Sequence, residues 1–389
     1  MRIASRNVCP LVLALAATSG AGMLAACAPA AQQSAKADVS VVATTTQICD
    51  YVTQIAAGAP ADAGLALDKV GAEGKEERIG APADKAKATI AMTCLLAPNA
   101  SAHEHEMTPQ QSTALANANL MLVSGVDLEH FLDSAVESSG FHGTMGVTAG
   151  VLTSAEVGDL QSQLAKEKDL PYKIDRGSQK VAVAKWPFPP EEGESEPEFV
   201  YDPHVWTSPK NAAVQVANIG EFLAKAAPKV KEPLEKSSAA FADKVTALDG
   251  WVKASIDSVP AERRVLFSSH DAFGYFSKSY GINFIGAALS DFNEQQDATA
   301  EHIASEAEKV KASGARALFA ENSNNSKSIE AIARAAGVKA VIGDDALYGD
   351  SLGPAGSEGE TYVSSIIHNV KTIVDAWGGK VADMPEALK

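Results

Sequence analysis

Short apolar runs alternate with stretches of helical periodicity along this chain, and the alternation limits the available folds more than any other feature. Apolar runs lie at 39–42, 89–96 and 120–123, with helical patterns at 48–55 and 110–117 between them. Strands that alternate with helices are typical of parallel βαβ units. The first half of the chain is therefore predicted to form an α/β lobe.

The second half repeats this alternation after one long helix. Apolar residues recur at helical spacing from 239 to 259, and Pro260 follows the run. Further strand candidates lie at 265–267, 284–285, 317–319 and 340–342. The sequence thus predicts an α/β fold of two lobes, with parallel sheets flanked by helices and one long linking helix between the lobes.

Two segments interrupt the pattern. Residues 61–87 are rich in Gly, Ala, Lys and Glu and have no strong apolar period, and residues 187–197 are rich in Pro and Glu. Both compositions are typical of solvated insertions. The sequence assigns a role to neither segment.

The N-terminus has the features of an export signal. Arg2 and Arg6 precede an apolar stretch at 11–17, and small residues follow. The segment ends in Leu-Ala-Ala-Cys at 24–27, which resembles a bacterial lipobox. This resemblance implies lipidation of Cys27 and an extracytoplasmic chain anchored to the cell membrane. An ordinary signal peptide with an incidental cysteine is the alternative.

A chain of 389 residues exceeds one ordinary core, so we expect more than one compact part. The expected parts are a signal peptide (1–26), a lipidated tether (27–38), an N-terminal α/β lobe (39–206), a connecting segment with the long linking helix (207–260) and a C-terminal α/β lobe (261–389). The formal net charge of −16 argues against nucleic-acid binding, which needs a basic surface.

Two cysteines remain besides Cys9 and Cys27. Cys49 follows the first predicted strand, and Cys94 lies in the second. In an oxidising compartment such a pair can form a disulfide, and two buried thiols fit the sequence equally well. No CxxC or CxxH spacing occurs, so the pair does not read as a metal site.

Three of the eight histidines stand out as candidate metal ligands, because each is predicted to lie in a loop rather than on a helix face. His103 follows the second predicted strand, His204 lies in Asp-Pro-His-Val-Trp at 202–206, and His270 follows the strand that opens the second half. Ligands of α/β folds bind outside the carboxyl ends of parallel strands, where imidazoles from separate loops can converge on a first-row metal ion. His105 lies two residues after His103 and is the alternative ligand from that loop.

These segments resemble the zinc/manganese-binding family of solute-binding proteins of ABC importers. The family has a first histidine after a proline-containing loop, then Asp-Pro-His-x-Trp, then His-Asp-Ala-Phe-x-Tyr. This chain has the three in that order, the last as 270–275, and Asp350 matches the family's fourth ligand near the C-terminus. The resemblance implies a metal site of His103, His204, His270 and Asp350 in the cleft between the lobes.

Three nitrogens and one carboxylate suit tetrahedral Zn²⁺, and a bidentate carboxylate would suit Mn²⁺ as the alternative. The acidic loop before His204 contains no histidine after His142, whereas the zinc branch of the family often has a His-rich loop there. The resemblance further implies a monomeric, non-enzymatic protein that delivers a divalent metal ion to an ABC-importer permease.

Two other functions fit parts of the sequence. A lipid-anchored adhesion protein could hold the same metal as a structural ion. A zinc hydrolase is disfavoured because a catalytic zinc has three protein ligands and an open position for water. The chain also contains no P-loop.

Overall fold

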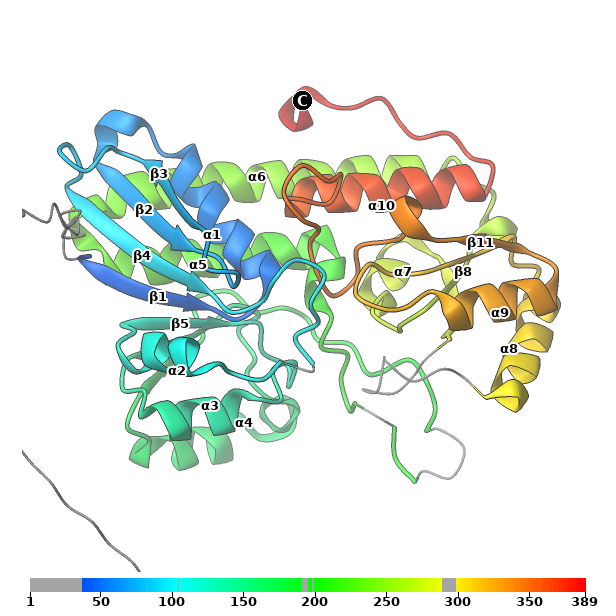
Figure 1. The fold of residues 1–389 in the computed structure, drawn as a ribbon, viewed down its shortest axis with the longest axis horizontal. Helices are drawn as coiled ribbons and strands as arrows, with labels where there is room; N and C mark the ends of the chain where they lie inside the picture. Colours follow the sequence, from blue (N-terminus) through cyan, green and yellow to red (C-terminus); the bar gives the residue numbers. More distant parts are fainter. Residues whose placement is uncertain (1–36, 104, 191–194, 198, 289–298) are drawn as a thin grey trace, which may run out of the picture. The chain divides into compact units, whose positions relative to one another are not determined.

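The computed structural model describes residues 37–389 apart from 104, 191–194, 198 and 289–298 (Figure 1). The expected signal peptide, the lipidated Cys27 and nearly all of the tether lie outside the described residues. Residues 36–389 form one compact unit that contains both predicted lobes. Within the described residues, no helix has the length and apolar character needed to cross a membrane.

The first half of the chain builds a seven-stranded sheet in the order β3-β2-β4-β1-β5-β6-β7. All neighbouring pairs are parallel except β2 and β3. The central strands are buried on both faces, as their continuous apolar runs predict. The strand bounds are β1 Val39–Ala43, β2 Leu65–Val70, β3 Glu76–Gly80, β4 Ala88–Cys94, β5 Leu120–Val123, β6 Thr144–Val147 and β7 Lys173–Asp175.

The prediction of a solvated insertion at 61–87 is wrong for its first part. This segment forms strands β2 and β3, and β2 pairs in parallel with β4. The first three residues of β2, Leu65 to Leu67, are buried, while β3 forms the exposed edge of the sheet. The apolar run at 65–67 is too short to predict a strand from the sequence, and its residues become buried because β2 pairs with β4.

The second half builds a four-stranded parallel sheet in the order β11-β10-β8-β9. Its strands match the four predicted apolar runs closely. Their bounds are β8 Val265–Ser268, β9 Asn283–Ala287, β10 Ala317–Phe319 and β11 Lys339–Val341. The predicted class, an α/β fold of two lobes, is therefore confirmed, with one antiparallel strand pair added.

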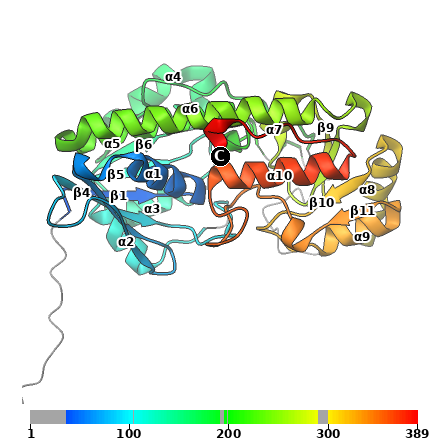
Figure 2. The ribbon, with the colours of Figure 1, turned by 90° about the horizontal axis from the view of Figure 1, so that it is seen from above.

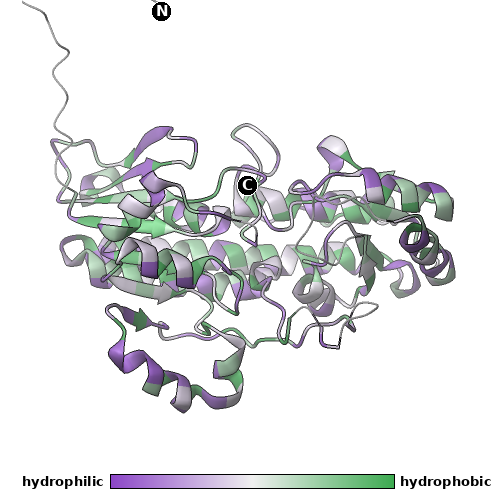
Figure 3. Ribbon diagram, turned by 60° about the horizontal axis from the view of Figure 1, so that its bottom comes forward, coloured by the Kyte–Doolittle hydropathy of each residue, from purple (hydrophilic) through white to green (hydrophobic). Residues whose placement is uncertain are grey.

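Ten helices occur in the described residues. Their bounds are α1 Thr46–Gly58, α2 Pro109–Ala116, α3 Leu132–Ser139, α4 Ser154–Lys166, α5 Pro209–Ala226, α6 Lys231–Ile256, α7 Gly274–Tyr280, α8 Ala300–Ser313, α9 Lys327–Ala336 and α10 Tyr362–Ala376. The long helix α6 follows the first sheet and precedes the second, and it contacts α1, α5 and α10 (Figures 1 and 2). Hydrophobic and hydrophilic residues alternate along the helices, as expected when each buries one face (Figure 3).

A disulfide joins Cys49 in α1 to Cys94 at the end of β4. The sequence left a bonded pair and two free thiols open, and the structure has the bonded pair. Because β1 lies directly before α1 and pairs with β4, this bond ties a helix to the sheet through a neighbouring strand. The segment leading to His103 begins immediately after Cys94.

Candidate metal centre

Four loops place the predicted ligand residues. His103 follows β4 and His270 follows β8, so both lie at the carboxyl end of a parallel strand. His204 precedes the short 3-10 helix η3 (Val205–Thr207), and Asp350 lies between the 3-10 helix η6 (Gly343–Asp345) and α10. All four side chains are buried, with His103 the most exposed at 7%.

The structure brings these four residues together. The Nε2 atom of His204 lies 3.0 Å from Nε2 of His103 and 3.2 Å from Nε2 of His270. Carboxylate oxygens of Asp350 lie 3.4, 3.6 and 3.5 Å from the Nε2 atoms of His103, His204 and His270. One ligand atom from each residue can thus be chosen so that all lie within 4.8 Å of one another.

The carboxylate of Asp202 orients the imidazole of His204. Its Oδ1 atom lies 2.9 Å from Nδ1 of His204 and also accepts a hydrogen bond of 2.9 Å from the backbone N–H of His204. A proton on Nδ1 satisfies this carboxylate and leaves the Nε2 lone pair facing the cluster. An imidazole held in this way is prepared to bind a cation.

Burial and charge separate the protonation behaviour of the three imidazoles. Burial lowers the pKa of His103 well below its usual range and lowers the pKa of His270 to about 4, despite the charge of Asp350. Burial also acts to lower the pKa of His204, but the hydrogen bond and charge of Asp202 prevail and raise it to about 9. The imidazoles of His103 and His270 are therefore neutral at pH 7. The imidazole of His204 carries a second proton, which a metal ion must displace.

Asp350 completes the cluster with a buried carboxylate. Burial acts to raise its pKa, but the neighbouring imidazoles of His270, His103 and His204 lower it to about 2. Its Oδ2 atom accepts a hydrogen bond of 2.8 Å from the hydroxyl of Ser101. Its Oδ1 atom is buried and has no hydrogen-bond partner among the described residues. Such an orphaned anionic oxygen, 3.6 Å from Nε2 of His204, fits a site built for a cation.

His105 does not belong to the cluster. Its ring lies edge-on to Phe131, with the ring centroids 4.9 Å apart, and no ligand group in the described residues includes it. Of the two histidines that the sequence left open in this loop, the structure places His103 with the other three residues. The intervening residue 104 is outside the described part of the chain.

Sequence reasoning gave little weight to several groups around the cluster. Asp271 lies with Oδ1 3.2 Å from Nδ1 of its neighbour His270, and burial raises the pKa of this carboxyl to about 7. Ser101 was not singled out at all, because a serine in a loop carries no pattern. Only the position of Ser101 opposite Asp350, 249 residues away, gives it a role.

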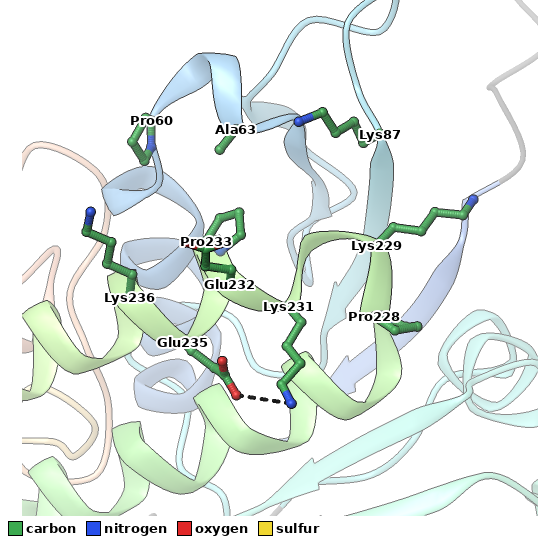
Figure 4. Close-up of a pocket in the computed structure, with 10 residues that line it drawn as sticks. All are labelled: Pro60, Ala63, Lys87, Pro228, Lys229, Lys231, Glu232, Pro233, Glu235 and Lys236. Atoms are coloured by element: carbon green, nitrogen blue, oxygen red, sulfur yellow. Dashed lines mark ion pairs between the residues drawn. The ribbon is translucent and has the colours of Figure 1, made fainter.

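A surface pocket lies away from these four residues. It has a volume of about 560 Å³ and is lined by residues of the loop after α1, the start of β4 and the turn between α5 and α6 (Figure 4). Lysines predominate among its charged residues, and one of them, Lys231, pairs with Glu235. None of the four clustered residues lines it, so its size does not identify it as the functional site.

The chain is similar to proteins whose names and descriptions refer to metal binding or metal uptake. A family model described as zinc-uptake complex component A, periplasmic, matches residues 83–376. The chain is 30% identical over 294 residues to the zinc-binding protein TroA of Treponema pallidum, a match that covers 75% of this chain and 83% of TroA. A solved structure of TroA superposes with a TM-score of 0.58 at 26% identity, covering 87% of this chain and 98% of that one.

Two other relatives carry different metals in their names. The manganese ABC transporter substrate-binding lipoprotein PsaA of Streptococcus pneumoniae is 29% identical over 174 residues, which are 45% of this chain and 54% of PsaA. The iron-binding protein YfeA of Yersinia pestis is 26% identical over 281 residues, which are 72% of this chain and 77% of YfeA. The names of these relatives therefore share metal binding but not the identity of the metal.

Proposed function

Because this chain belongs to the zinc-uptake complex component A family of periplasmic proteins, we propose that it captures one divalent transition metal ion, zinc in preference to manganese, for an ABC importer. Membership of this family makes the chain a metal-binding component of ABC import and not an enzyme. The choice of metal, the ligand set, the membrane anchor and the partner are the parts that we propose.

One observation carries the proposal: buried ligand atoms of four residues converge. The Nε2 atom of His204 lies 3.0 and 3.2 Å from those of His103 and His270, the Asp350 oxygens lie 3.4 to 3.6 Å from the three nitrogens, and one atom from each residue lies within 4.8 Å of the others. Zinc–ligand bonds of about 2.0–2.2 Å at tetrahedral angles would place ligand atoms roughly 3.3 to 3.5 Å apart. The displaceable proton of His204 can be shared with only one of the two neighbouring imidazole nitrogens at a time, whereas a single cation can bind the lone pairs of all three. We therefore assign His103, His204, His270 and Asp350 as the metal ligands.

The donor set favours zinc over manganese. Three imidazole nitrogens and one carboxylate are a common zinc environment, whereas manganese favours oxygen ligands and higher coordination numbers. Manganese would need both oxygens of Asp350, and Oδ2 already accepts a hydrogen bond from Ser101. TroA, named as a zinc-binding protein, supports this preference, and PsaA makes manganese the alternative to test.

The number of protein ligands favours a site that binds a metal ion without catalysing a reaction. Four protein ligands leave a tetrahedral ion no open position for a water nucleophile. In this proposal residues 39–206 and 261–389 act as the two lobes, with 207–260 connecting them. A lipidated Cys27 holds the monomeric protein outside the cytoplasm, next to the permease that receives the ion. The named lipoproteins among its relatives support that location.

Metal analysis of the chain expressed from residue 28 onward tests the proposal, because this chain keeps the whole compact unit of residues 36–389. We expect one chelator-removable ion per chain, and tighter binding of zinc than of manganese in competition titrations. His204→Ala and Asp350→Ala should both weaken binding strongly. His302→Ala is the matched control, because His302 lies in α8 outside the cluster. Absence of stoichiometric binding, or binding that neither substitution weakens, would refute the assigned site.

A further inference from the structure

The loop that carries Asp350 has little secondary structure of its own. It lies between η6 and α10, and its backbone makes only one isolated bridge among the described residues, between Leu347 and Glu321. Asp350 nevertheless is 2% exposed and points into the cluster. Backbone groups buried in such a loop need hydrogen-bond partners from elsewhere. Those partners decide where the carboxylate of Asp350 lies.

Asn369 in α10 supplies two of these hydrogen bonds. Its Oδ1 atom accepts from the backbone N–H of Tyr348, and its Nδ2 group donates to the carbonyl of Tyr348, both at 2.8 Å. The amide thus pairs with both backbone groups of one residue, as a neighbouring strand would. Asn369 is 1% exposed, and only an amide side chain offers a donor and an acceptor in this arrangement.

Trp206 holds the next residue of the loop. Its indole N–H donates to the carbonyl of Gly349 at 2.9 Å, and its own carbonyl accepts a hydrogen bond of 2.7 Å from the hydroxyl of Tyr362. Trp206 lies two residues after His204, so the turn that presents one ligand also fastens the loop that presents another. Tyr362 belongs to α10, the helix that carries Asn369.

We propose that Asn369 and Trp206 are positioning residues for the metal centre, which fasten the backbone just before Asp350 and thereby limit how fast bound metal leaves. This inference rests on the proposed function. In this arrangement neither residue touches the metal. Each acts by holding the Tyr348–Gly349 backbone at the distance from His204 that brings the Asp350 carboxylate within 3.6 Å of the imidazole nitrogens.

The test compares three variants of the chain from residue 28 onward, loaded with zinc. Asn369→Ala removes both hydrogen bonds to Tyr348, and Trp206→Phe removes the hydrogen bond to Gly349 while keeping an aromatic ring. Val374→Ala is the control, because Val374 is an equally buried apolar residue of α10 that packs in the hydrophobic core and forms none of the hydrogen bonds to residues 348 and 349. Mixing with excess chelator in a stopped-flow instrument gives the dissociation rate, and thermal unfolding of the metal-free proteins gives their stability.

We expect Asn369→Ala and Trp206→Phe to release zinc about 10-fold or more faster than the parent chain, by analogy with other groups that orient metal ligands. Both should also change the visible absorption spectrum of the Co²⁺-loaded protein, which reports ligand geometry. Val374→Ala should lower stability without changing the release rate or the spectrum. If Asn369→Ala does not fold, Trp206→Phe alone decides the matter.

The inference is overturned if the folded variants lose stability but release zinc at the parent rate with an unchanged Co²⁺ spectrum. That result would leave them with a purely structural role, while the parent chain still bound its ion. A parent chain that binds no metal would instead refute the proposed function and this inference with it. The two failures are therefore distinguishable by the parent protein alone.

Discussion

Replacing Asp202 by asparagine separates two opposing effects of this carboxylate on metal binding. Asp202 raises the pKa of His204 to about 9, so a proton competes with the metal at neutral pH. The same carboxylate, 2.9 Å from Nδ1, also strengthens the imidazole as a ligand. Asp202→Asn keeps the shape of the side chain but removes the charge that produces both effects.

The magnitudes follow from the pKa and from the hydrogen bond. With a pKa of about 9 for His204, the apparent affinity of the parent protein should rise about 10-fold from pH 7 to 8 and about 50-fold in total from pH 7 to 9, where half of the His204 side chains have lost the competing proton. The loss of an orienting carboxylate costs about 10–100-fold in intrinsic affinity, or about 1.4–2.7 kcal/mol. In Asp202→Asn the pKa of His204 falls, so the affinity curve should be nearly flat. At pH 9 the parent should then bind zinc about 5–50-fold more tightly than Asp202→Asn, whereas at pH 7 the variant should bind as tightly as the parent or up to about 10-fold more tightly.

Chelator competition at each pH gives the affinities. Calorimetry in buffers of different ionisation enthalpy counts the protons released. We expect about one more proton released per zinc by the parent than by Asp202→Asn at pH 7. Equal proton release, or parallel affinity curves from pH 7 to 9, would refute the assignment of Asp202 as the group that holds the proton on His204.

Three further outcomes are expected. His105→Ala should leave zinc affinity within about 2-fold of the parent in chelator competition, because its ring packs on Phe131 outside the cluster; a loss as large as that of His204→Ala would restore His105 as a ligand. Cys49→Ser with Cys94→Ser should lower the free energy of unfolding in denaturant titrations by about 4 kcal/mol, since the disulfide closes a long loop of the unfolded chain. Zinc at 1,000 times its dissociation constant should add about 4 kcal/mol to stability, yet the metal-free chain should keep its circular dichroism spectrum; unfolding on chelation would instead favour a structural ion.

The strands and the long helix could be predicted where a local pattern was strong. The run at 317–319 matches β10, and the helical spacing from 239 onward lies within or just beyond α6. Strands β6 and β7 were not predicted, since neither is a continuous apolar run: β6 includes Thr144 and Gly146, and β7 has a single apolar residue between Lys173 and Asp175. Strand β2 was missed for a related reason: three buried residues stand among charged ones, and only pairing with β4 makes them a strand.

The sequence by itself determined the kinds of ligand and the loops that hold them. Two histidines after predicted strands, a third in Asp-Pro-His-Val-Trp and one aspartate near the C-terminus are local features, so they can be recognised from short stretches of the sequence. The alternation of strands and helices could also be predicted, because the spacing of apolar residues that distinguishes a helix from a strand involves only residues close together in the sequence.

The tertiary structure alone decided which of these residues meet. His103 lies in the cluster and His105 does not, although they are two residues apart, because the loop turns one ring toward His204 and the other toward Phe131. The disulfide partner of Cys49 and the serine that contacts Asp350 were settled in the same way. Such contacts join residues 45 to 249 positions apart, and these distances close only when the whole chain packs.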